Sequence, residues 1–177
     1  MEPAWSPDGN IIYTVDHVSS SDPGTSEESQ QFDLLAIPLT GGLPVHLVQD
    51  VGMFAYPSPS PLNVEEDSLV NDAGTSVNQN SYLVAYLQSI FPEQSGTSRY
   101  RLFIIDRDGS NQKALFPEEG AVGLDPQQVV WSPESMGTDG SYAIGLIYQG
   151  NVWLVDTTSG LAQQITGDGL SIRLDWR

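Results

Sequence analysis

The sequence has no cysteine and only two histidines among its 177 residues. The lack of cysteine leaves the redox compartment open, because a disulfide framework is typical of much smaller secreted chains. The histidines, His17 and His46, are too few for a metal site built from several imidazoles, and one histidine without a second ligand nearby makes no zinc or manganese site. We therefore expect structural or surface roles for both.

Positive charge and long apolar runs are also scarce. Six Lys and Arg against 23 Asp and Glu give a net charge of −17, which repels nucleic acid and anionic lipid. No apolar stretch approaches the roughly 18 residues needed to span a bilayer, and Met1-Glu2-Pro3 lacks the basic start and apolar segment of a signal peptide. The sequence thus predicts a soluble chain with no nucleic-acid partner and no membrane insertion.

The remaining surface is mostly neutral and polar. Only 16% of the residues are charged, while Ser, Thr, Gln, Asn and Gly are plentiful, a pattern that favours an exported protein in the periplasm, the cell envelope or outside the cell. The acidic balance permits a cationic partner. Acidic residues cluster at Glu27 and Glu28 and again at Glu65, Glu66 and Asp67, although solvated loops also account for these clusters.

What the chain does contain is a repeat. Trp5-Ser6-Pro7 recurs as Trp131-Ser132-Pro133, and Trp176 stands at a third equivalent point. The 45 positions from Trp131 to Trp176 match the period of a four-stranded propeller blade. The 126 positions from Trp5 to Trp131 fit two units only if two polar insertions, at 18–31 and 62–80, are loops or disorder.

Short β-type runs fill each unit, joined by turn dipeptides such as Asp8-Gly9, Gly41-Gly42 and Asp108-Gly109. We find no helical period, so helix should be near zero. We expect one domain over 1–177, with blade 1 at about 1–50, blade 2 at about 51–120, blade 3 at about 121–169 and the first strand of a further blade at 170–177. The expected strands are 10–15, 33–39, 44–48, 81–88, 101–106, 112–116, 128–131, 142–148, 151–156, 162–166 and 172–176.

Three segments carry a resemblance to a known family. Residues 3–13 (PAWSPDGNIIY), 102–110 (LFIIDRDGS) and 151–156 (NVWLVD) with 163–166 (QQIT) resemble the repeat of the TolB-like, WD-repeat-like propellers, which are typically six-bladed. The resemblance covers about three-quarters of the chain. It departs in the second unit, which lacks the Trp-Ser-Pro-Asp-Gly core, and in the third, where Glu134 replaces the motif's Asp.

The expected fold class is all-β: a propeller of four-stranded antiparallel blades in an incomplete ring. Three blades fall short of the four to eight of closed propellers, and an open arc leaves an apolar face at each end. Two copies related by a two-fold axis would close a six-bladed homodimer, although residues 172–176 would compete with the partner's own first strand at Ala4-Trp5. The other interpretation is a fragment, because the chain opens inside one repeat and ends inside another.

Four features are candidate sites. Asp106, Asp108 and Asn111 resemble the start of a calcium loop, but the twelfth position is Pro117 rather than Glu, and a hairpin turn, which we favour, explains them fully. The tryptophans suggest a sugar platform, but their repeat position favours core packing between blades. Asp8-Gly9 is typical of turn chemistry. Residues 57–61 (PSPSP) are either a ligand for a proline-binding module or, as we favour, an edge connection.

No Gly-x-Ser-x-Gly nucleophile elbow occurs, and we assign no catalytic residue and no cofactor. The sequence favours a non-catalytic module that binds or scaffolds a protein or peptide through its loops or central channel. The resemblance also implies an alternative, the substrate-gating propeller of a prolyl-oligopeptidase-type peptidase whose catalytic domain is absent from this chain. A weaker alternative is a sensor of carbohydrate or another ligand.

Overall fold

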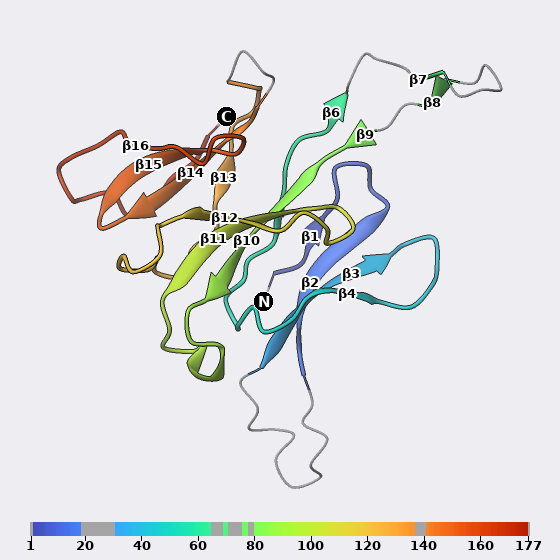
Figure 1. Cartoon of the computed structure of the whole chain (residues 1–177), viewed down its shortest axis with the longest axis horizontal. Helices are drawn as coiled ribbons and strands as arrows, with labels where there is room; N and C mark the ends of the chain where they lie inside the picture. Colours follow the sequence, from blue (N-terminus) through green and yellow to red (C-terminus); the bar gives the residue numbers. More distant parts are fainter. Residues whose placement is uncertain are drawn as a thin grey trace, which may run out of the picture.

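Three four-stranded antiparallel sheets carry the fold, and the all-β prediction is confirmed. The computed structural model describes residues 2–18, 31–64, 69–70, 76–77, 80–136 and 141–176. Within these residues the one helical element is the short 3-10 helix η1, Pro92–Gln94. The sheets, which we call blades 1, 2 and 3, lie side by side in chain order (Figure 1).

Each blade is an antiparallel meander whose first strand is only two residues long. Blade 1 comprises β1 (Ala4–Trp5), β2 (Ile11–His17), β3 (Phe32–Pro38) and β4 (Val45–Val48). Blade 2 comprises β5 (Ser58–Pro59), β10 (Leu83–Ser89), β11 (Tyr100–Asp106) and β12 (Lys113–Phe116). Blade 3 comprises β13 (Val130–Trp131), β14 (Ala143–Tyr148), β15 (Asn151–Asp156) and β16 (Ala162–Gln164).

The two expected insertions fare differently. Residues 19–30 of the first lie outside the described residues, and a hydrogen bond from the Val18 amide to the Gln31 carbonyl joins the chain on either side of them. In the second, where we expected loops or disorder, two short ladders form instead. They pair β6 (Asn63–Val64) with β9 (Asn80–Ser81), and β7 (Leu69–Val70) with β8 (Ser76–Val77).

One expected strand is absent: residues 172–176 form no β-ladder. A strand needs a neighbour to receive its N–H and C=O groups, and the second strand of a further blade is not present among the described residues to pair with this one. The segment instead lies against blade 3, where a Cβ placed on Gly145 would be 2.7 Å from Leu174 Cδ2 and 3.6 Å from Trp176 Cε3.

Two apolar clusters join the blades. Side chains of blade 1, including Tyr13 and Leu34, pack on Val84 and Ile105 of blade 2. The opposite face of blade 2 packs on blade 3 in a cluster that includes Leu102 and Ile144. Because successive strand residues point to opposite faces, the central sheet is apolar on both sides, as its burial pattern shows for β10.

A buried serine fixes the first strand of every blade. The amide of Ile11 donates to Ser6 Oγ at 2.9 Å, that of Leu83 to Ser60 Oγ at 3.1 Å, and that of Ala143 to Ser132 Oγ at 3.0 Å. In return the three serine amides each donate to the carbonyl of the same partner residue at 2.8 Å. The contact recurs in blade 2, whose repeat motif is degenerate, so Ser60-Pro61 is the counterpart of Ser6-Pro7.

The repeated tryptophans differ in burial. Trp131 is 8% exposed, and its indole Nε1 donates to the Ser58 carbonyl of the preceding blade at 2.8 Å. Trp5, at the equivalent place in blade 1, is 60% exposed. The prediction of core packing is therefore right for Trp131 and wrong for Trp5, whose side chain lies on the face of blade 1 directed away from blade 2.

Replacing Trp131 by Ala should lower the free energy of unfolding by about 3–5 kcal/mol, because it empties a buried site between two blades. The matched change Trp5→Ala should cost less than about 1 kcal/mol, since most of that side chain is already in water. Urea unfolding followed by circular dichroism measures both. Equal losses for the two variants would contradict the assignment of Trp131 to the blade interface.

Replacing Ser132 by Ala should cost about 1–3 kcal/mol, because the buried amide of Ala143 loses its acceptor. Thr158→Ala, which trims an exposed side chain, is the control and should change stability by less than about 0.5 kcal/mol. The same urea titration compares them. A neutral Ser132→Ala would show that the serine contact does not hold the first strand.

Candidate functional site

The candidate site is a cleft between the rims of blades 2 and 3, with a volume of about 390 Å³. It lies where the turns between first and second strands meet the hairpins between third and fourth strands. We call it the interblade cleft. Its lining residues are Ser60, Ser81, Tyr82, Leu83, Asp106, Arg107, Asp108, Ser141, Tyr142, Thr157 and Thr158.

The blade 2 wall is built by the hairpin after β11. The Gly109 amide donates to the Asp106 carbonyl at 2.9 Å, and Gly109 has φ +87°, a left-handed conformation that favours glycine. A Cβ at Gly109 would also approach Leu47 Cα of blade 1 to 3.2 Å. This close approach fixes where Asp106 and Asp108 stand at the cleft mouth.

A tyrosine pair supports the floor beside Arg107. Tyr13 Oη donates to the Arg107 carbonyl at 3.2 Å and therefore accepts from Tyr82 Oη, 2.7 Å away. The Arg107 guanidinium carbon lies 5.9 Å from the centroid of the Tyr82 ring, within cation–π range. Burial raises the pKa of the Tyr13 phenol, so the Tyr13 hydroxyl stays protonated at neutral pH.

The blade 3 wall is tied to blade 2 by Lys113. Its Nζ donates to the carbonyls of Thr157 and Thr158, at 3.1 and 2.6 Å. Thr157 Oγ1 donates in turn to the Tyr142 carbonyl at 2.8 Å. The two Lys113 bonds thus join the blades that form the walls of the cleft, and the Thr157 bond fixes the hairpin within blade 3.

Hydroxyl donors keep the nearby carboxylates ionised. The Ser159 hydroxyl, followed by the Ser159 amide, lowers the pKa of Asp156, whose other oxygen accepts from Ser141 Oγ at 2.9 Å. At the cleft mouth the Ser110 hydroxyl, 2.6 Å from Asp108 Oδ1, lowers the pKa of Asp108. Asp108 therefore carries a full negative charge at neutral pH.

The calcium candidates form a hydrogen-bonded turn. Asn111 directs its amide nitrogen to Asp106 Oδ2 at 2.6 Å, and Ser110 donates to both Asp106 and Asp108. Among the described residues no group of three or more His, Cys, Asp or Glu is placed to hold a metal ion. The turn chemistry expected at Asp8-Gly9 takes the same form: Ser6 Oγ donates to Asp8 Oδ1 at 2.6 Å, and Gly9 has φ +72°.

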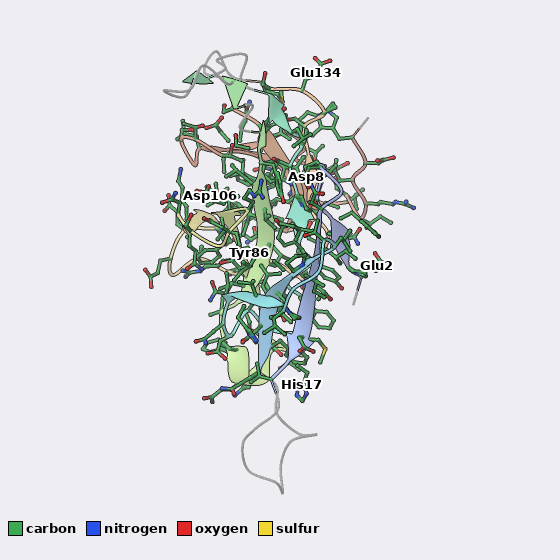
Figure 2. The ribbon with its side chains drawn as sticks, turned by 90° about the vertical axis from the view of Figure 1, so that its right-hand side faces the viewer. Glu2, Asp8, His17, Tyr86, Asp106 and Glu134 are labelled. Carbon is green, nitrogen blue, oxygen red and sulfur yellow. The ribbon has the colours of Figure 1, made fainter. Side chains whose placement is uncertain are left out.

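Neither histidine lines the cleft. His17 lies at the lower end of the view in Figure 2, well below Asp106, and its ring is tilted against Phe32, with centroids 5.1 Å apart. His46 Nδ1 lies 2.9 Å from Asp33 Oδ2, which is mostly buried. Each histidine thus has a contact of its own within blade 1, and neither lines the cleft.

A second, larger hollow of about 770 Å³ lies along the inner ends of the blades. Its lining includes Glu2, Tyr56, Gln128 and Asp175, and Gln128 Nε2 donates to Glu2 Oε2 at 2.7 Å. Beside them the Gln127 side chain bonds both the amide and the carbonyl of Ile147, and so extends the pairing with β14 ahead of the start of β13. Because residues 172–175 form part of its wall, the shape of this hollow depends on a segment without ladder pairing.

Sequence reasoning named Asp106 and Asp108 for this region but missed Tyr82, Arg107, Tyr142 and the threonines. These residues come from turns up to about 75 positions apart, and only the register of the strands brings them together. The repeat itself could have predicted this grouping. The hairpins after β11 and β15 both follow the third strand of a blade, so equivalent hairpins of neighbouring blades lie on the same rim.

Comparison with known proteins gave no match: no family model fits the chain, and no curated protein resembles it significantly in sequence. In the part of the chain that the structure describes, no helix has the length and apolar character to cross a bilayer.

Calcium should leave the melting temperature unchanged, because one oxygen of each carboxylate, Asp106 Oδ2 and Asp108 Oδ1, is already bonded to Ser110 or Asn111 within the turn. Differential scanning calorimetry measures this, with magnesium at equal ionic strength as the control for screening of the −17 charge. A saturable rise specific to calcium and lost in Asp108→Asn would contradict the turn interpretation.

Proposed function

We propose that this chain is a non-catalytic, TolB-like propeller module of an exported or cell-envelope protein, which binds a protein or peptide partner. The interblade cleft receives an extended segment of that partner carrying a cationic side chain. The observation that carries the proposal is the cleft itself: a preformed concavity between two blades with aromatic walls, hydroxyl groups and carboxylates at its mouth.

The size and lining of the cleft support a short peptide stretch. Its volume of about 390 Å³ lies within the range of ligand sites, about 300–1,000 Å³. Tyr82 and Tyr142 offer ring surface, while Thr158 and Ser81 offer hydroxyls for main-chain groups. Because Lys113 fixes the wall spacing, a partner would not have to order the cleft on binding.

Charge supports a cationic partner. Asp106 and Asp108 stand in the lining with Arg107, which gives the cleft an excess of one negative charge at neutral pH. The net charge of −17 adds a long-range field that raises the encounter rate of a cation and repels anions. Arg107, held over the Tyr82 ring, leaves the two carboxylates as the groups that select for charge.

The hydroxyls of the lining have structural tasks that support a binding role over a catalytic one. Ser60 Oγ accepts the Leu83 amide at 3.1 Å, Ser141 Oγ donates to Asp156 Oδ2, and Thr157 Oγ1 donates to the Tyr142 carbonyl. A serine or threonine nucleophile needs an adjacent general base to take its proton. Here the neighbouring groups act as hydrogen-bond partners in turns.

A peptide selection tests this proposal. We expect random peptides displayed on phage and selected on the wild-type protein to be enriched in Lys and Arg. Thr158→Trp, which fills the cleft, should weaken the selected peptides by about tenfold or more. Thr97→Trp, at an exposed position next to η1 on the other rim, is the matched control and should bind as the wild type does. Fluorescence anisotropy of the synthetic peptides gives the dissociation constants.

Two results would oppose the proposal. Peptides that bind Thr158→Trp as tightly as the wild type would place their site outside the cleft. A failure to enrich any peptide, with defined oligosaccharides binding in a Thr158→Trp-sensitive way, would favour the carbohydrate sensor instead.

A further inference from the structure

The three blades differ at one position of the second strand, in a way that depends on the first strand of the next blade. Strand register pairs Trp5 with Ile12, Pro59 with Val84, and Trp131 with Ile144. The next residue along each second strand is therefore equivalent, and it is Tyr13 in blade 1, Ala85 in blade 2 and Gly145 in blade 3. We call this position the seat, because it lies beneath the side chain of the following first strand.

Where the seat residue is small, a large side chain from the next first strand lies over it, and where the seat residue is large, the side chain over it is small. Ala85 and Trp131 belong to one buried cluster, and the Trp131 indole reaches the carbonyl of Ser58, the cross-strand partner of Ala85. Tyr13 fills its own seat, and the following blade has the small Pro59 in place of Trp. Gly145 leaves an open pit, in which Trp176 and Leu174 lie.

Trp176 reaches that pit from a segment with weak backbone ties, residues 170–176, which we call the C-terminal strap. The strap forms no β-ladder, and the Ser171 amide, which donates to the Gly150 carbonyl at 2.7 Å, attaches its start. Ile172 is 95% exposed, whereas Leu174 and Trp176 are half-buried. Side-chain packing over Gly145 is thus one of the contacts that hold the end of the strap.

The other end of the arc holds the complementary element. Trp5 is 60% exposed on the face of blade 1 directed away from blade 2, beside the half-buried Ile12 and Ile37, which are paired across β2 and β3. This is an indole in the position that Trp131 occupies, on a first strand fixed by the same serine contact. Among the described residues it has no seat, because Tyr13 fills that of blade 1, Ala85 carries Trp131, and Gly145 lies beneath Leu174 and Trp176.

We propose that Trp5 and the pit over Gly145 are the two halves of a contact between two copies of this chain, and that the C-terminal strap occupies the pit in the isolated chain. The Ala85–Trp131 contact is the template for this interface. Two three-bladed arcs joined by it twice, about a two-fold axis, make a ring of six blades, within the range of closed propellers. The inference is independent of the peptide-binding cleft.

The strap sets the affinity of the two copies for each other. It is tethered beside the pit, so its effective concentration is of the order of millimolar, and a second copy at micromolar concentration competes poorly with it. Each copy carries −17, so mutual repulsion opposes association and added salt favours it. Opening the pit should therefore convert a monomer into a dimer, most strongly at high ionic strength.

Sedimentation equilibrium of the full chain and four variants tests the contact. Leu174→Ser/Trp176→Ser opens the pit and should lower the dimer dissociation constant by about tenfold or more. Trp5→Ala added to that variant should return it to monomer, as should Gly145→Phe, which fills the pit as Tyr13 fills its own seat. Ile172→Ser, at an exposed strap position, is the matched control and should behave as the wild type does.

The outcomes separate cleanly. A double variant that stays monomeric at the highest concentration, or a dimer that Trp5→Ala leaves intact, overturns the contact. A wild type as dimeric as the double variant overturns the role of the strap, and open-ended oligomers overturn ring closure.

Two further measurements guard against loss of folding. If the double variant is unfolded by circular dichroism, Trp176→Ser alone takes its place in the same comparison. A synthetic peptide with the sequence of residues 170–176 should dissociate the dimer, whereas the same peptide with Leu174 and Trp176 replaced by Ser should not. A dimer indifferent to both peptides overturns the proposal.

Discussion

The structure depends on apolar sheet faces packing against one another. A small antiparallel sheet whose apolar face is exposed to water is only marginally stable. Here each blade is stabilised by burying its apolar face against a neighbouring blade. Blade 2 is covered on both sides, by Tyr13 and Leu34 of blade 1 and by Ile144 and Trp131 of blade 3. Among the described residues the outer faces of blades 1 and 3 have no second neighbouring blade, and Trp5 on the outer face of blade 1 is 60% exposed.

Polar contacts at the blade boundaries fix how those faces meet. The Trp131 indole bonds the Ser58 carbonyl, Lys113 bonds the carbonyls of Thr157 and Thr158, and the Tyr13–Tyr82 pair joins blade 1 to the hairpin of Arg107. Such bonds contribute modestly to stability but strictly limit the allowed sliding of one sheet on another. The interblade cleft exists because these bonds fix the positions of blades 2 and 3, so that the rims forming its walls stay separated.

Sequence patterns predicted the strands best where local chemistry and tertiary contacts agree. Residues 151–156, β-branched and bounded by turn residues, form β15 as expected. The segment 172–176 has a similar composition but no ladder, because pairing requires a second strand that composition alone does not supply. The sequence did not predict the cleft: it singled out Asp106 and Asp108 as calcium candidates, and Tyr82 and Thr157 join them only through strand register and blade packing, which are non-local.

The tryptophan of the repeat is its most conspicuous residue, but it does not mark every blade. Two apolar side chains that pack across an interface can differ in size between repeats at small cost, provided that their total volume is kept. Tyr13 is matched with the small Pro59, whereas the small Ala85 packs with Trp131. The serine before the proline has no such freedom, because its loss orphans a buried amide. Serine therefore persists in blade 2 where tryptophan does not, and the hydroxyl–amide contact defines the repeat unit more faithfully than the indole.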